Sequence, residues 1–217
     1  MRIVAIADTH GHHGLLRVPG GDVLVHAGDM CQRGTMSELV ESARWIRSLP
    51  HPVKIVVPGN HDWPFVLTPG EARAAFGPSV TVLEDSGVTI DGVKFWGSPW
   101  QPEFCGWAYN LPRGPRLAMR WAEIPDGTDV LITHGPPAGT GDRTDRGERV
   151  GCADMRDRIE VLRPKLHLFG HIHEDGGAWD VDGTLTVNCT VSYGQRAPTV
   201  IEIEGDKARA SAPVRSG

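Results

Sequence analysis

The sequence predicts an α/β fold in which a parallel sheet is followed by antiparallel strands of a second sheet packed on the first. Two observations carry this prediction. Short apolar runs rich in β-branched residues alternate with a helical pattern up to residue 62, which is typical of parallel strands joined by right-handed crossovers. From residue 80 the runs follow one another closely, and Asp91-Gly92 between two of them indicates a hairpin.

The composition is that of an ordinary globular protein, and it limits the partners. Of the 217 residues, 40% are hydrophobic and 23% are charged, which fits one generous domain. The formal net charge is −5, so we expect no long nucleic acid as partner. No apolar window is long enough to cross a bilayer, so no membrane is expected. Four scattered cysteines, and a first strand that follows no leader segment, favour a cytoplasmic location.

The amino-terminal half contains the first buried strands. We expect strands over residues 2–7, 22–27 and 53–57, with a helix from Thr35 to Leu49 before the third of them, because its apolar residues recur at helical spacing and Pro50 ends it. A short helix is expected near Pro69 to Phe76. Three strands then follow at residues 80–83, 88–90 and 93–97.

The carboxy-terminal half continues with alternating elements. A helix ends at about Ile124, a strand covers residues 129–133, a helix runs from about Cys152 to Leu162, and a strand covers 166–169. Residues 185–189 and 199–203 are expected to be antiparallel strands that complete the second sheet. We therefore expect one domain over residues 1–204 and a frayed tail over residues 205–217, where the composition becomes polar and small.

Five polar clusters each follow a predicted strand. They contain two carboxylates, one amide and several imidazoles that meet at one crevice if the strands are parallel, because the carboxyl ends of such strands share an edge. Thiolates are missing, which argues against a structural zinc site and favours a pair of iron, manganese, zinc, cobalt or nickel ions. The candidate ligands are Asp8, His10, Asp29, Asn60, His134, His171 and His173.

The order of these clusters resembles the calcineurin-like metallophosphoesterases. The family blocks D-x-H, G-D, G-N-H-[DE], a single H and G-H-x-H are all present between residues 8 and 173. The resemblance implies a four-layer α/β/β/α sandwich, in which two mixed sheets lie face to face with helices outside. Within the family, the runs at 96–102 (WGSPWQP), 134–137 (HGPP) and 151–152 (GC) most resemble small metallophosphoesterase-domain phosphodiesterases.

The resemblance also implies roles for the residues of the blocks. It places Asp8, His10 and His173 on one ion, places Asn60, His134 and His171 on the other, and makes Asp29 the bridge. His61 would face the phosphoryl group and protonate the leaving oxygen or stabilise developing charge. The implied reaction is the attack of a metal-bridging hydroxide on a phosphoester, with two divalent or mixed-valence ions and manganese as the best choice in vitro.

One departure from the family concerns the partner of His61. Protein phosphatases of the family carry an Asp where Gln32 stands here, and that Asp holds the catalytic histidine. We therefore expect the polarisation of His61 to be weaker or to be taken over by Asp62. Arg33, which follows Gln32, is a candidate contact for phosphate.

Two loops are candidates for substrate recognition. The stretch 98–116 carries Trp100, Trp107 and Tyr109 without periodicity, and either these rings pin the loop to the core or one of them, Trp100 above all, stacks on substrate. The loop 138–151 holds three arginines before a helix, among them Arg146, which are either solvated or placed to bind an anion.

Three functions are compatible with the blocks. The first is a phosphodiesterase for a small substrate such as a cyclic nucleotide or nucleotide diester, the second a phosphomonoesterase or protein phosphatase, and the third a catalytically silent scaffold. The retained ligand set weighs against the scaffold, and Gln32 weighs against the protein phosphatase. The sequence is silent on oligomeric state.

Overall fold

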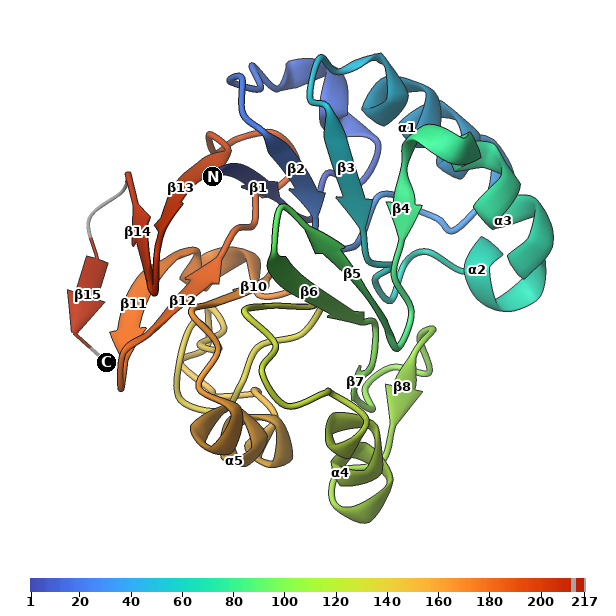
Figure 1. Ribbon diagram of the computed structural model, residues 1–217. Coiled ribbons are helices and arrows are strands. Elements are labelled where there is room, and N and C mark those ends of the chain that lie inside the picture. Colours follow the sequence, from blue (N-terminus) through green and yellow to red (C-terminus); the bar gives the residue numbers. More distant parts are fainter. Residues whose placement is uncertain (212–213, 217) are drawn as a thin grey trace.

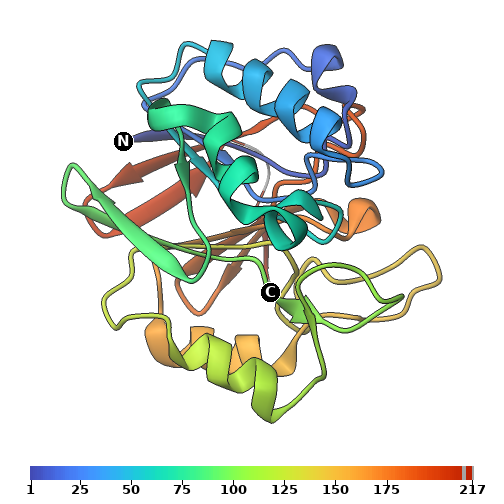
Figure 2. The same ribbon diagram turned by 90° about the vertical axis from the view of Figure 1, so that its right-hand side faces the viewer.

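Two β-sheets lie face to face between two groups of helices in the computed structural model, which describes residues 1–211 and 214–216 (Figures 1 and 2). Among these residues, one sheet has six strands in the order β14-β13-β1-β2-β3-β4. The other has seven in the order β15-β11-β12-β10-β9-β6-β5. The predicted four-layer sandwich is confirmed.

The first sheet is parallel at its centre. The strands β1 (Arg2–Ile6), β2 (Val23–His26), β3 (Val53–Val56) and β4 (Thr81–Val82) run in the same direction. Against its outer face lie α1 (Met36–Ser48), α2 (Pro64–Leu67) and α3 (Pro69–Phe76). Helix α1 begins where Thr35 and Glu38 form a capping box, which satisfies amides that a helix leaves free at its start.

The second sheet is mixed. The strands β5 (Ser86–Ile90) and β6 (Val93–Ser98) form the expected hairpin, and β6, β9 (Val130–Thr133), β10 (Leu166–Phe169) and β12 (Thr184–Asn188) are parallel neighbours. Strand β11 (Gly177–Val181) pairs antiparallel with β12. Helices α4 (Pro115–Ala122) and α5 (Ala153–Leu162) cover its outer face, and a small ribbon of β7 (Gln101–Pro102) and β8 (Asn110–Leu111) lies beside α4 (Figure 1).

Successive side chains of the central strands pack against different layers. In β1, Ile3 and Ala5 face the second sheet and belong to the core between the sheets, whereas Val4 and Ile6 face α1 and α3. The period of two along a strand places successive side chains on opposite faces, so a continuously apolar strand is buried on both. A separate apolar cluster around Trp121 and Met155 joins α4 and α5 to the second sheet.

Two expectations about the carboxy-terminal region are wrong. Strand β13 (Thr199–Glu204) joins the first sheet, antiparallel to β1, and not the second. Residues beyond 204 are not simply frayed: β14 (Lys207–Ala210) pairs with β13, and β15 (Val214–Ser216) pairs with β11. The Gly205-Asp206 turn, with Gly205 at φ 57°, returns the chain so that alternate alanines of β14 reach the core. Residues 212, 213 and 217 of the expected tail lie outside the described residues.

None of the helices in the described part of the chain is both long and apolar enough to span a bilayer.

Candidate metal centre

The predicted ligands come together where five strands end. The ends of β1, β2 and β3 carry Asp8, Asp29 and Asn60, and those of β9 and β10 carry His134 and His171. The first three strands are neighbours in one sheet and the last two are neighbours in the other. A bridge between Ala7 and Thr190 joins the two sheets at this edge, so one crevice collects residues from both.

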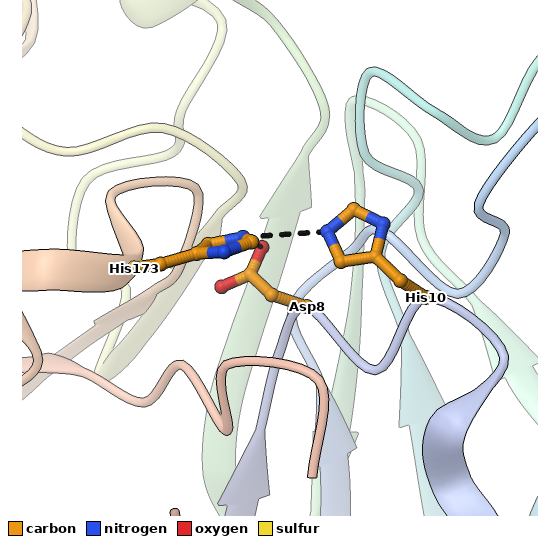
Figure 3. A group of neighbouring side chains, drawn as sticks. All are labelled: Asp8, His10 and His173. Carbon is orange, nitrogen blue, oxygen red and sulfur yellow. Dashed lines mark hydrogen bonds and ion pairs between the residues drawn. The ribbon is translucent and has the colours of Figure 1, made fainter. Parts of the chain in front are cut away.

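The first cluster of possible metal ligands consists of Asp8, His10 and His173. The Nε2 atoms of the two histidines are 3.3 Å apart, and His173 Nε2 is 3.7 Å from Asp8 Oδ1. Figure 3 shows the two rings facing each other across the Asp8 carboxylate. Burial disfavours a charged Asp8, yet the hydrogen bond and charge of His173 lower the pKa of Asp8 to about 2.

The second cluster consists of Asp29, His134 and His171, with Asn60 beside it. His134 Nε2 lies 2.9 Å from Asn60 Oδ1 and 3.3 Å from Asp29 Oδ2. The same Asp29 oxygen is 3.6 Å from His10 Nε2 of the first cluster. Asp29 therefore stands between the clusters, in the position a shared ligand requires.

The hydrogen bonds of two ligand histidines fix the nitrogen that faces the site. His10 Nδ1 lies 3.0 Å from the Cys31 carbonyl oxygen, and His134 Nδ1 lies 2.9 Å from that of Ala27. A carbonyl oxygen only accepts, so Nδ1 donates in each case and the neutral ring points the lone pair of Nε2 at the crevice. Without an ion, the charge of Asp29 favours a proton on Nε2 of His134, and a metal ion bound there would take the place of that proton, so this donor set fits metal ions.

The charge of the site supports the same conclusion. Burial opposes protonation of His134, yet the Asp29 charge raises the pKa of this histidine to about 9. His134, His10 and His61 in turn keep the pKa of Asp29 below its usual range, although burial acts against them. Two buried carboxylates thus impose a negative field that a bound cation would neutralise.

His61 forms a third group of possible metal ligands with His10 and Asp29, and its ring has a fixed orientation. Its Nδ1 is 2.8 Å from the Gln32 carbonyl oxygen, so the residue that replaces the phosphatase Asp still supplies the acceptor, from its backbone. The ring stacks on Trp107, with centroids 4.2 Å apart, and meets the His10 ring edge-on at 4.7 Å. Its backbone amide donates to Asp29 Oδ1 at 2.8 Å.

Asp62 does not take the role expected of it. Its carboxylate is fully buried and accepts four backbone hydrogen bonds, two on each oxygen, from the amides of Asp29, Met30, Cys31 and Gly59. These bonds tie the loop after β2 to the loop after β3. Asp62 therefore positions two ligand loops, and the acceptor for His61 is the Gln32 carbonyl.

A cavity of about 170 Å³ opens over the clusters. In the part of the chain that the structure describes, its lining includes no arginine or lysine. Glu174 adds a further acid beside the ligands. The lining residues are His10, Asp29, Asn60, His61, Phe104, His171, His173, Glu174 and Tyr193.

The predicted substrate residues lie elsewhere. Trp100 donates from Nε1 to Asp85 at 2.7 Å, and the Arg120 guanidinium lies 4.6 Å from its ring centre, so Trp100 pins the loop to the core. Trp100 is not among the residues that line the cavity, and its stacking on substrate stays a prediction. Arg33 and Arg146 are both exposed, and neither lines the cavity. Their contact with phosphate stays a prediction.

Of three aromatic residues at the site, Trp107 is one of the rings named in the loop 98–116, whereas Phe104 and Tyr193 were not singled out from the sequence. Trp107 stacks on His61, and Phe104 meets the His171 ring edge-on, with centroids 5.4 Å apart. Tyr193 stacks on the His10 ring at 4.7 Å, from a turn in which it has a φ of 59°. The loop 98–116 contained a signal for the first two, but no pattern in the sequence marks Tyr193.

Comparison with known proteins agrees with this geometry. The family model described as calcineurin-like phosphoesterase matches residues 1–175. Metallophosphoesterase domain-containing protein 1 of Homo sapiens is 40% identical, over 92% of this chain and 70% of the human protein. UPF0046 protein K07C11.7 of Caenorhabditis elegans is 38% identical, over 87% of this chain and 69% of that protein.

The fold is also found among solved structures. The crystal structure of TT1561 from Thermus thermophilus superposes with a TM-score of 0.68 at 16% identity, covering 97% of this chain and 98% of that one. The chain belongs to the calcineurin-like phosphoesterase family. This family consists of phosphoester hydrolases that use divalent metal ions, and the clusters described above could hold such ions.

Proposed function

We propose that the protein hydrolyses a small phosphodiester, such as a cyclic nucleotide or a nucleotide diester, with two transition ions. The observation that carries the proposal is the placement of Asp29 within reach of ligand histidines from both clusters. When bound, two such ions clamp the phosphoryl oxygens and acidify a water molecule. Manganese is our choice for assays, and iron, zinc, cobalt and nickel share its preference for imidazole and oxygen donors.

In this proposal His61 handles the proton of the leaving group. Because Nδ1 faces the Gln32 carbonyl, Nε2 is the nitrogen that can donate a proton to the leaving oxygen. The Trp107 and His10 rings flank the imidazole and hold its plane. General acid catalysis of this kind contributes typically about 10²–10⁴ in rate.

The charge of the cavity favours a diester over a monoester. A diester carries one negative charge, whereas a monoester carries nearly two at neutral pH. The described lining offers no lysine or arginine for a second charge, and it includes the acidic Glu174. This observation supports diesters, and it weighs against the alternative of a monoesterase or protein phosphatase.

Hydrolysis of bis(p-nitrophenyl) phosphate beside p-nitrophenyl phosphate tests the proposal. The protein is stripped with chelator and reloaded with manganese, and Asp29→Ala serves as the control that lacks the shared ligand. We expect metal-dependent diester turnover that the control loses. Turnover of the monoester alone would establish the alternative, and silence on both substrates with metals bound would favour a scaffold.

The proposed setting is the cytoplasm, with a small phosphoester as partner and neither a membrane nor long nucleic acid. The scattered cysteines support this location, and Cys31, Cys152 and Cys189 are buried as free thiols.

A further inference from the structure

A second cavity adjoins the metal centre. It has a volume of about 280 Å³ and shares two lining residues, Phe104 and His171, with the cavity over the clusters. We call it the side pocket. Its other lining residues are Gln101, Pro102, Glu103, Arg113, Gly135, Pro136, Thr144, Val150 and Ile172. A group bound there would lie next to a phosphoryl group held at the ligand histidines.

The apolar wall of the side pocket suits a flat ring. Two prolines, Val150 and Ile172 supply apolar surface, and Phe104 stands at the border with the metal centre. Phe104 is 43% exposed although its ring already contacts His171, which leaves an aromatic surface open to a second ring. The volume is at the lower end for small-molecule sites, which are about 300–1,000 Å³, so it suits one ring system and not an oligomer.

The polar groups of the side pocket include two without partners. Gln101 is 1% exposed, and its Oε1 has no hydrogen-bond partner in the described structure. Thr144 Oγ1 is buried and is likewise without a partner among the described residues. A buried acceptor that makes no hydrogen bond destabilises the free protein. A ligand that donates a hydrogen bond to it removes this cost, and the free energy recovered adds to the affinity.

Two linked hydrogen bonds determine which side-chain atom of Gln101 has no partner among the described residues. The Phe104 carbonyl oxygen accepts at 2.7 Å from the Asn110 side chain, so the amide nitrogen of Asn110 points there. Its Oδ1 then faces Gln101 Nε2 at 3.1 Å, which leaves Gln101 Oε1 as the orphan. Pairing of β7 with β8 holds this arrangement at the base of the loop.

We propose that the side pocket binds one ester group of the diester, and that this group carries a planar ring with an N–H or amino group that donates to Gln101 Oε1. The proposal rests on the phosphodiesterase function in that it names the chemistry of one ester group of the substrate. Bonds from the Arg113 guanidinium to the carbonyl oxygens of Gly151 and Val150, at 2.7 and 2.6 Å, hold this side chain in the pocket wall, where Glu103 is also present.

Binding of phosphonates tests the proposal without turnover. Isomeric indol-4-yl, indol-5-yl and indol-6-yl phosphonic acids present an anion to the metals and a ring to the side pocket, and their C–P bond is not hydrolysed. Each is compared with its N-methyl form, which has the same ring without a donor. Calorimetry on the manganese-loaded protein is expected to show at least one isomer that binds about tenfold tighter than its N-methyl form.

Two variants and a matched control complete the test. Gln101→Met removes the acceptor, and we expect it to abolish the preference for the N–H form. Gln195→Met makes the same change at an exposed glutamine and is expected to keep the preference. Should Gln101→Met fail to fold, Val150→Phe fills the pocket from its half-buried wall and is expected to weaken binding of every indolyl phosphonate.

The outcomes separate this proposal from the proposed function. Equal affinities for all three pairs in the native protein would overturn the side-pocket proposal, even if diesters are hydrolysed. So would a preference that Gln101→Met retains. A preference that depends on Gln101 in a protein that hydrolyses no diester would support the pocket and refute the phosphodiesterase.

Discussion

Replacing Asp62 by asparagine tests whether this carboxylate holds the ligand loops. One oxygen accepts from the amides of Met30 and Cys31 at 3.0 and 2.9 Å, and the other from Asp29 and Gly59 at 3.0 and 2.8 Å. Asparagine keeps the shape, but its NH₂ group faces two backbone donors in place of an acceptor. Hydrogen bonds to a charged group contribute about 1.5–3 kcal/mol each, so the loss of two predicts a destabilisation of about 3–6 kcal/mol.

Urea unfolding followed by tryptophan fluorescence at pH 7 measures this change, on metal-free protein so that metal affinity does not enter. Asp157→Asn is the matched control, because the Asp157 side chain is 62% exposed and water screens its ion pair with Arg156. A free energy of unfolding for Asp62→Asn within about 1 kcal/mol of the native protein would refute the reasoning. Unchanged stability with an altered pH profile of turnover would instead restore Asp62 as the partner of His61.

His61→Ala is expected to lower kcat on a diester by about 10²–10⁴ without loss of bound metal, which kinetics and elemental analysis together measure; a loss of metal would make His61 a ligand. Gly28→Ala is expected to reduce both metal content and melting temperature, because Gly28 has a φ of 100° and a methyl group there would overlap the ring of a ligand histidine. Gly139→Ala, at a φ of 95° in open space, carries the backbone strain alone and should keep its metals. Burial lowers the pKa of His26 and of His167 to about 3, so below pH 6.5 the unfolded chain takes up protons that the native protein refuses. The free energy of unfolding should therefore decrease as the pH is lowered, by about 2 kcal/mol per histidine between pH 6.5 and 5. Urea unfolding at a series of pH values measures this, and a decrease of the same size in His167→Phe would contradict the reasoning.

The strands and the ligand positions could be predicted because their signals are local. A buried apolar run that ends in Gly-Asp or Gly-Asn-His shows where a strand stops, and parallel neighbours bring such ends together. The helix α1 was also readable, since Thr35 and Glu38 form its cap and Pro50 follows it. All seven predicted ligands lie in the same crevice for this reason.

The partners of individual side chains could not be predicted in the same way. Asp62 follows His61 directly, but its carboxylate points to backbone amides of another loop, which only the tertiary fold brings near. Of the two tryptophans in the loop 98–116, Trp100 donates to Asp85 and Trp107 stacks on His61. Aromatic content alone does not distinguish these outcomes.

The carboxy-terminal strands were missed for a different reason. Gly205-Asp206 is a hairpin signal, but the polar composition that follows it is also typical of a disordered tail. Strand β14 lies at the edge of its sheet, where only alternate residues need to be apolar, and alanines suffice for that. Small residues at an edge strand therefore resemble a disordered tail in composition.

The origin of the ligands in both sheets has a consequence for the whole molecule. Asp8, Asp29 and Asn60 follow strands of one sheet, and His134 and His171 follow strands of the other, so ions held among them would act as a reversible cross-link between the two halves of the sandwich. A ligand that binds only the native state adds about 2.7 kcal/mol of stability when its concentration is about a hundredfold above its Kd. Under the proposed function, removal of metal would thus lower the stability of the contact between the sheets as well as stop hydrolysis.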